Sequence, residues 1–320
     1  MNLQTKIPLT PAANQIDYSG QLLLLGSCFA ENMGRKFDYY KFPFLQNPFG
    51  IFFHPLAIEN LIEKAVREAS YSEADVFFLN GRWHCFDAHS DLSNASQEHL
   101  IKNLNDGLNA TRDQLSKSTH IIITLGTAWV YRNIKNGSIV ANCHKVPQKQ
   151  FSKALLSVNG ISESLQKTMK HIRSVNENVQ VIFTVSPIRH LKDGFIENQR
   201  SKAHLITSLD AVLTPRAQSR GPAYFPSYEI MMDELRDYRF YKSDMVHPND
   251  VAVDYIWEKF KDVWISEECN GVMDQVEAIQ KGLQHKPFHA DSKEHKEFLK
   301  SLNTKITYLQ QQYPFMEFNP

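Results

Sequence analysis

Short apolar runs that stop at a small or polar residue are the feature that most constrains how this chain folds. Residues 22–25 are four consecutive leucines followed by Gly26, and residues 121–125 and 179–185 form similar runs. Runs of this kind are typical of strands that are buried on both faces, as in a parallel sheet covered by helices. They therefore predict strands at the centre of a large domain.

Segments with apolar residues at helical spacing lie between these runs, at residues 29–39, 55–69, 96–115, 161–175, 198–212 and 249–264. Strands that alternate with helices predict an α/β fold with a doubly wound parallel sheet. Asn80-Gly81 and Asn136-Gly137 each separate two apolar runs, which predicts two β-hairpins inserted into that fold. We expect one α/β domain over residues 1–264 and a helical C-terminal extension, packed on it, over residues 265–320.

Composition excludes several classes of protein. The chain has 35 basic and 35 acidic side chains and no long basic run, so we expect no nucleic-acid partner. No apolar stretch approaches the length needed to cross a bilayer, and the first residues lack the pattern of a signal peptide. The four cysteines are scattered, which indicates reduced thiols. We therefore expect a cytoplasmic protein without a membrane partner, and the sequence leaves its oligomeric state open.

The turn after the first predicted strand, Gly26-Ser27-Cys28-Phe29-Ala30, is the first candidate for chemistry. Functional residues of doubly wound sheets lie at the carboxyl ends of strands. A thiol at a helix N-terminus is expected to have a lowered pKa, and the free N–H groups there can stabilise an oxyanion. The turn predicts a nucleophile, although a buried tight turn or a binding loop has the same composition.

The second candidate is the segment Asp244-Met245-Val246-His247-Pro248-Asn249, before the last helix of the predicted main domain. The spacing lets the Asp244 carboxylate accept a hydrogen bond from one ring nitrogen of His247. The other nitrogen can then act as a general base. The alternative is that both residues only cap a loop and a helix.

Together, the two segments resemble the arrangement of SGNH, or GDSL, hydrolases, and more closely that of the GSCFA family, over about residues 20–262. Four further stretches share the resemblance, namely Asn47-Pro48-Phe49-Gly50, Thr124-Leu125-Gly126-Thr127-Ala128, Asn142-Cys143-His144-Lys145 and Ser186-Pro187-Ile188-Arg189. The resemblance implies a three-layer, flavodoxin-like fold and a hydrolase or acyltransferase that acts on ester bonds.

The chain departs from the wider hydrolase pattern at the nucleophile. That pattern is Gly-Asp-Ser, and aligning its glycine with Gly26 places Cys28 at the nucleophile position. The other register makes Ser27 the nucleophile. We favour Cys28, because a thiolate needs less help from a base than a hydroxyl does.

The oxyanion donors also depart from that pattern. The wider pattern implies a backbone N–H at the nucleophile, a glycine N–H after the second strand, which Gly50 matches, and an asparagine after the third. This chain has Gly126-Thr127 at the third position. Thr127, Asn47 and Asn142 are the alternatives for the missing donor.

Three weaker signals remain open. His144 is either a substrate contact or a structural histidine, and Arg189 either binds a substrate carboxylate or phosphate or forms a surface ion pair. The cluster of His84, Cys85, Asp87 and His89 resembles metal ligands by residue type, but it lacks the paired spacing of a zinc site. We predict no metal and no cofactor.

Together with the resemblance, these residues predict a hydrolase of ester bonds, with a small ester or an acylated carbohydrate as its substrate. The alternatives are an acyltransferase on the same fold and a non-catalytic ligand-binding module. A nucleotide-binding protein is disfavoured, because no glycine-rich phosphate loop follows the first predicted strand.

Overall fold

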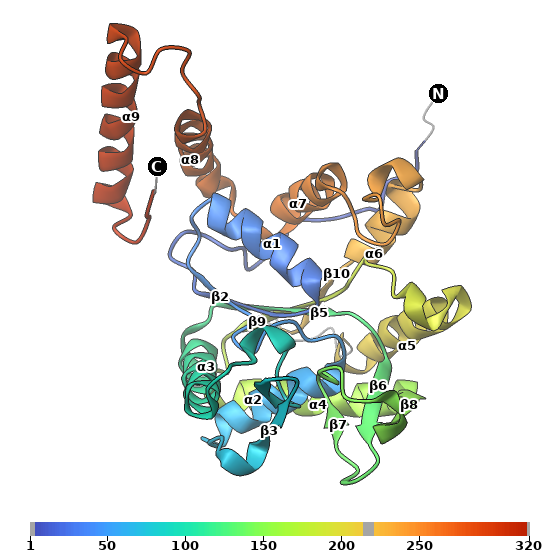
Figure 1. Ribbon diagram of the computed structural model, residues 1–320. Helices are drawn as coiled ribbons and strands as arrows, with labels where there is room; N and C mark the ends of the chain where they lie inside the picture. Colours follow the sequence, from blue (N-terminus) through green and yellow to red (C-terminus); the bar gives the residue numbers. More distant parts are fainter. Residues whose placement is uncertain (1–3, 214–220, 319–320) are drawn as a thin grey trace.

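The computed structural model describes residues 4–213 and 221–318. A five-stranded parallel sheet lies between two layers of helices (Figure 1). The strands of this sheet are β1 (Leu22–Gly26), β2 (Phe44–Gln46), β5 (His120–Leu125), β9 (Gln180–Val185) and β10 (Ala223–Phe225). The helices are α1 (Cys28–Tyr39), α2 (Pro55–Val66), α3 (Gln97–Lys117), α4 (Val158–Val175), α5 (Phe195–Leu213), α6 (Ser227–Glu229), α7 (Asp250–Trp264), α8 (Asn270–Leu283) and α9 (Lys293–Gln312).

The strands lie in the order β10-β9-β5-β1-β2, and every pair is parallel. The chain passes from β1 to β2 on one side and later enters β5 on the other side of β1. The order in which strands are added to the sheet therefore reverses between β1 and β5. This topological switch point is where doubly wound folds bind ligands. The predicted fold class, a three-layer α/β fold with flavodoxin-like strand order, is confirmed.

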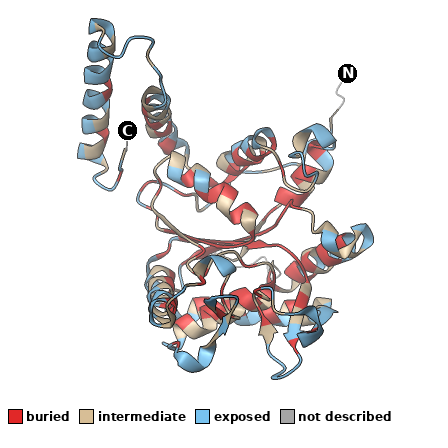
Figure 2. Ribbon diagram, in the orientation of Figure 1, coloured by how far each residue is buried: buried red, intermediate tan, exposed pale blue. Residues whose placement is uncertain are grey.

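The apolar runs are buried because each strand contributes side chains to both faces of the sheet. Leu23 and Leu25 of β1 pack into the hydrophobic cluster formed with α2 to α5, whereas Leu22 and Leu24 pack into the cluster formed with α1 and α7. Figure 2 shows the sheet and the helix faces turned toward it as buried. This two-sided burial explains why the run has no polar residue at alternate positions.

Both predicted hairpins form outside the central sheet. β3 (Val76–Leu79) pairs with β4 (Arg82–Cys85), and Asn80 and Gly81 have the positive φ angles of 50° and 78° that a type I′ turn requires. β6 (Trp129–Asn133) pairs with β7 (Ile139–Val140). β8 (Phe151–Leu155), which the sequence pattern did not indicate, pairs with the other edge of β6.

The C-terminal helices pack through apolar side chains. Met273, Val276 and Ile279 of α8 join the cluster that contains Phe37 of α1, and Leu302 and Leu309 of α9 extend it. The boundary expected after residue 264 coincides with the end of α7. The division into two domains stays a prediction, and its outer limits, residues 1 and 320, lie outside the described residues. None of the helices in the described part of the chain is both long and apolar enough to cross a membrane.

Candidate active site

A cavity of about 710 Å³ lies at the carboxyl ends of the central strands. Cys28, Thr127 and His190, which follow β1, β5 and β9, line it, together with Asp244 and His247 from the loop before α7. Trp129 and Tyr131 of β6 and Val140 of β7 form a further part of its wall. The structure thus brings both candidate segments, more than 200 residues apart in sequence, to one cavity.

The turn after β1 is held by backbone geometry that only glycine tolerates at its first position. Gly26 has a φ angle of 131°, and a Cβ atom there would lie 2.1 Å from the carbonyl oxygen of Thr124. The Gly26 N–H donates to Oδ1 of Asn47 over 2.9 Å, and the Gly26 carbonyl accepts from the Phe52 N–H over 2.9 Å. These contacts fix the direction in which the following two side chains leave the sheet.

Ser27 and Cys28 have different environments. Ser27 is fully buried and is the N-cap of α1, where its Oγ accepts a 3.4 Å hydrogen bond from the Phe29 N–H. Cys28 is the first residue of α1, is half-buried, and lines the cavity. Of the two alternatives, only Cys28 presents its side chain to the space where a substrate would lie.

The expected lowering of the Cys28 pKa by the helix N-terminus is wrong. Burial raises the pKa of the Cys28 thiol above its usual value. The backbone N–H groups of Cys28 and Phe29 and the charge of Lys202 lower the pKa, and Glu31 raises it, but burial is the largest influence. The thiol is therefore protonated at neutral pH and needs a base to take its proton.

Asp244 and His247 form the hydrogen-bonded carboxylate–imidazole pair that the spacing predicts. Nδ1 of His247 lies 2.7 Å from Oδ2 of Asp244, and Oδ1 of Asp244 accepts the N–H groups of Val246 and His247 over 2.8 Å and 3.0 Å. Those two backbone hydrogen bonds are the main reason that the pKa of Asp244 falls to about 2. The carboxylate stays ionised and leaves Nε2 of His247 as the nitrogen available to a reacting group.

Arg189 positions the loop that carries this pair. Its guanidinium donates to the carbonyl oxygen of Met245 and lies 4.4 Å from the ring centre of Tyr241, and its backbone N–H donates to Val246 over 3.2 Å. Arg189 does line the cavity. Arg189 forms no ion pair among the described residues, and its Nε is buried without a hydrogen-bond partner, so a substrate contact of this guanidinium stays a prediction.

The N–H groups of Gly50, an expected oxyanion donor, and of Gly126, at the third position of the wider pattern, are already used. The Gly50 N–H donates to the carbonyl of Asn47 over 2.7 Å, and His89 packs against Gly50. The Gly126 N–H donates to Phe53 over 3.0 Å. Neither glycine lines the cavity, so Gly50 does not match the donor role that we expected from the sequence.

Asn47, Thr127 and Asn142 differ in what they still offer. Asn47 is buried beneath the turn, where it holds Gly26. The Thr127 N–H donates to the carbonyl oxygen of Phe53 over 2.7 Å, and its hydroxyl pairs with Oγ of Ser201 over 2.9 Å and accepts from the Trp129 N–H over 3.1 Å. Oδ1 of Asn142 accepts from the His144 N–H over 2.9 Å, and the Asn142 side chain lines the cavity with its Nδ2 group unpaired among the described residues.

His144 lies outside this cavity and is tied to the first hairpin. Its Nε2 lies 2.6 Å from the carbonyl oxygen of Cys85, and its ring packs 4.9 Å from that of His84. Burial lowers the pKa of His144 to about 4, so the ring is neutral. These contacts favour the structural role over a substrate contact.

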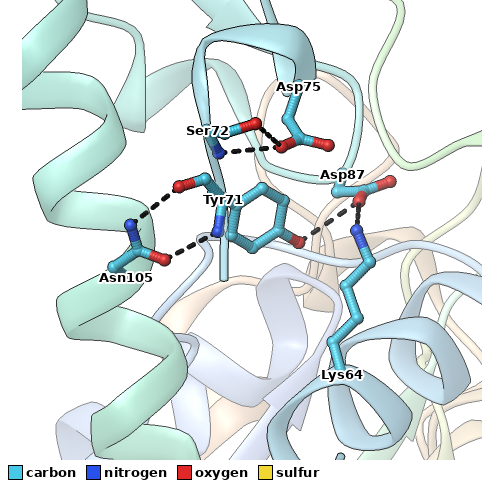
Figure 3. A network of polar contacts seen from close by, with 6 residues as sticks. All are labelled: Lys64, Tyr71, Ser72, Asp75, Asp87 and Asn105. Atoms are coloured by element: carbon cyan, nitrogen blue, oxygen red, sulfur yellow. Dashed lines mark hydrogen bonds and ion pairs between the residues drawn. The ribbon is translucent and has the colours of Figure 1, made fainter. Parts of the chain in front are cut away.

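The residues that resemble metal ligands are occupied by other partners. Asp87 pairs with Lys64 over 2.6 Å and accepts from the Tyr71 hydroxyl over 3.2 Å, in the polar network shown in Figure 3. Cys85 is buried, and His89 pairs with Asp91 over 3.0 Å. The described residues contain no group of three or more side chains arranged to hold a metal ion.

Sequence reasoning missed His190 and Lys202. His190 lines the cavity, and its ring meets that of Phe53 edge to face at 5.9 Å. Lys202 of α5 is fully buried, and its Nζ donates to the carbonyl oxygens of Gly126 and Ser186 over 2.7 Å each. The one sequence signal for the burial of Lys202 was helical spacing, because Lys202 falls on the same helical face as Asn198 and Leu205.

Comparisons with known proteins bear on the family. A model of the GSCFA family matches residues 21–260, and a model of the GSCFA domain protein, C-terminal domain, matches residues 276–320. No curated protein matches the chain.

Among solved structures, an acetyl xylan esterase from the rumen bacterium Butyrivibrio proteoclasticus is similar, with 11% identity and a TM-score of 0.32. The similarity covers 84% of this chain and 65% of that enzyme, and at this score it carries no argument about activity. The first family model, by contrast, covers most of the sequence and includes both segments that line the cavity. The chain belongs to the GSCFA family.

Proposed function

We propose that this protein is a hydrolase of ester bonds that uses Cys28 as its nucleophile. The single observation that carries this proposal is the shared cavity, which Cys28 lines together with the hydrogen-bonded pair Asp244 and His247. A nucleophile and an oriented base that face one cavity are the groups that acyl transfer requires. Ser27 is not proposed, because it is fully buried and caps α1.

The reaction proceeds in two steps. His247 removes the proton of the Cys28 thiol as the sulfur attacks the ester carbonyl, forming a tetrahedral oxyanion. Collapse of this species breaks the carbon–oxygen bond, and the leaving alkoxide takes the proton from His247. Water then attacks the thioester with His247 as base, which releases the carboxylic acid and restores the thiol.

The role of Asp244 follows from its charge. Its ionised carboxylate accepts from Nδ1 of His247, which holds the ring in one orientation and stabilises the imidazolium that forms in each step. Because the pKa of Asp244 is held at about 2, the carboxylate remains charged over the whole working range.

The oxyanion would be stabilised by donors that the cavity still offers. These are the backbone N–H of Cys28 at the start of α1 and the amide of Asn142. Removing one such donor typically costs on the order of a hundredfold in rate. Asn142 thus takes the place of the asparagine in the wider hydrolase pattern.

The cavity wall fits a small ester or an acylated carbohydrate. Trp129, Tyr131 and Phe53 supply aromatic surface beside the polar groups of the reacting centre. Aromatic faces of this kind bind compact, partly apolar ligands. Transfer of the acyl group to a sugar hydroxyl instead of water is the alternative outcome of the same acyl-enzyme.

Hydrolysis of an activated short ester, p-nitrophenyl acetate, tests the proposal. We expect turnover by the wild type and a loss of about a hundredfold or more in Cys28→Ala and in His247→Ala. His289→Ala, at an exposed position far along the chain, and Cys269→Ser, outside the cavity, are matched controls that should retain turnover. Equal product release by wild type and His247→Ala contradicts the enzyme and leaves a ligand-binding module.

Added glycerol or xylose separates hydrolysis from transfer. If the protein is a hydrolase, the added alcohol does not change the amount of free acetate released per ester consumed. An acyltransferase instead forms the acetylated alcohol at the expense of acetate.

A further inference from the structure

Helix α5 presents a buried polar face to the loops that wall the cavity. Asn198, Ser201 and Lys202 are all at most 3% exposed. Asn198 accepts the backbone N–H of His190 over 2.9 Å, and Ser201 accepts that of Ala128 over 2.7 Å. One turn of this helix therefore holds the segments that follow both β5 and β9.

Lys202 makes the contacts nearest to the nucleophile turn. Its Nζ donates to Gly126, the residue after β5, and to Ser186, the residue after β9. A Cβ atom on Gly126 would lie 3.1 Å from Cβ of Ser27, so this glycine packs directly against the turn that carries Cys28. The ammonium group thus joins the ends of two neighbouring strands behind the cavity.

Hydrogen bonding alone does not explain why an ionisable side chain is buried at this position. Two carbonyl groups can be satisfied by a neutral donor, and a buried charge is costly unless it is compensated. No carboxylate of the described residues lies within ion-pair distance of its Nζ. Of the groups that interact electrostatically with Lys202, only the thiolate of Cys28 carries the opposite charge, because Tyr228 offers a ring face and His190 is neutral or positive.

We propose that Lys202 is a positioning residue of this active site, which holds the ends of β5 and β9 and, while protonated, favours the ionised form of Cys28. This inference rests on the proposed function only in treating Cys28 as the nucleophile. The same charge stabilises the negative sulfur that forms as His247 removes the proton.

The ionisation of Lys202 gives the inference a distinctive pH dependence. Burial lowers the pKa of Lys202 to about 7. Below that pH the charge is present and favours the thiolate, and above it the charge is lost. Four other titratable groups lie close to Cys28 or Lys202 or in the same cavity wall. Tyr228 has its ring centre 5.7 Å from Nζ of Lys202, and burial raises its pKa above the usual value. Glu31 raises the thiol pKa, His247 lies in the cavity wall, and the pKa of His190 is lowered to about 3, outside the range tested.

The test is the rate at which iodoacetamide alkylates Cys28 between about pH 6 and pH 9, read by peptide mass spectrometry. Lys202→Gln removes the charge and keeps an N–H donor. We expect alkylation about tenfold slower than in wild type near pH 6, and rates that converge above pH 7 as wild-type Lys202 loses its proton. Ser201→Ala, which removes a neutral hydrogen bond from the same helical face, should follow the wild-type profile.

Two results overturn the proposal. One is an unchanged profile in folded Lys202→Gln, and the other is a shift of equal size at every pH, which a structural change alone would produce. If Lys202→Gln does not fold, the pH profile of Cys28 alkylation is measured in His247→Asn instead. This variant lacks the imidazole in the cavity wall, so an inflection near pH 7 reports the ionisation of Lys202. An inflection there supports the proposal, and a straight rise overturns it.

The assay reads the thiol and requires no ester turnover. A protein that hydrolyses no ester but shows the convergent profiles retains this inference and loses the proposed function. A protein that hydrolyses esters with parallel profiles does the reverse.

Discussion

The different environments of Ser27 and Cys28 make a sharp prediction about two adjacent alanine substitutions. Ser27→Ala removes a buried hydroxyl that caps α1, and Cys28→Ala removes the side chain that lines the cavity. We expect the first to affect stability and the second to affect turnover. The reason is that the hydroxyl of Ser27 has no access to substrate.

The size of the stability effect follows from the cap. Replacing a serine N-cap by alanine costs about 1 kcal/mol. The hydrogen bond from Phe29 to Ser27 Oγ is long, at 3.4 Å, which places the cost toward the lower part of the usual range. With an unfolding entropy of about 2 cal/mol/K per residue, a cost of about 1 kcal/mol lowers the Tm by only about 1.5 °C.

Thermal unfolding and p-nitrophenyl acetate hydrolysis, measured on the same preparations, check both expectations. Ser157→Ala is a matched control, because Ser157 caps α4 with a 3.1 Å bond from Gly160 and lies outside the cavity. Both serine variants should lose a similar small amount of stability and retain turnover. Loss of turnover in folded Ser27→Ala, with turnover retained in Cys28→Ala, refutes the reasoning.

Three further predictions follow from the same geometry. Gly26→Ala should abolish soluble expression or lower the urea midpoint sharply, because its Cβ atom would lie 2.1 Å from the carbonyl oxygen of Thr124 at a φ angle of 131°. Asp244→Asn should lower kcat by about a hundredfold or more, because the neutral amide no longer stabilises the His247 imidazolium, and should lower the Tm only slightly, because the side chain is exposed. The free energy of unfolding should fall between pH 7 and pH 5, measured by urea titration. Burial lowers the pKa of His54 and of His144 to about 4, so in this range the unfolded chain binds protons that the folded chain does not, at on the order of 2 kcal/mol each by pH 5. Stability independent of pH over this range contradicts the neutral buried rings.

The sequence predicted those parts of the fold that local patterns determine. The leucines at 22–25 specify a buried strand by themselves, and Asn80-Gly81 specifies its turn because few residue pairs adopt two positive φ angles. The pairing of β8 with β6 escaped prediction, because Phe151–Leu155 is largely exposed and carries no strong apolar pattern.

The candidate site was predictable where the chemistry lies within a few residues. The spacing of Asp244 and His247 sufficed for their 2.7 Å contact. The roles of Gly50 and Arg189 depended on backbone hydrogen bonds, to Asn47 and to Met245 and Val246, that residue type and spacing do not predict. Lys202 was missed because a lysine on a helix is ordinarily exposed, whereas this one is buried.

The pKa of the Cys28 thiol also differs from the expectation. A helix N-terminus lowers a thiol pKa in general, but at this site burial outweighs the nearby N–H groups. The thiol is therefore a weaker nucleophile on its own than the sequence indicated. The proposed mechanism consequently depends more strongly on His247.

Direct trapping of the acyl-enzyme tests the central claim, that Cys28 is the nucleophile of an ester hydrolase. Wild-type protein is mixed with p-nitrophenyl acetate, quenched in acid within the first turnovers, and mapped by peptide mass spectrometry. We predict one acetyl group on Cys28, removable by hydroxylamine as a thioester is, and no adduct in Cys28→Ala. An acetyl group on Ser27, or turnover without any adduct at Cys28, contradicts it.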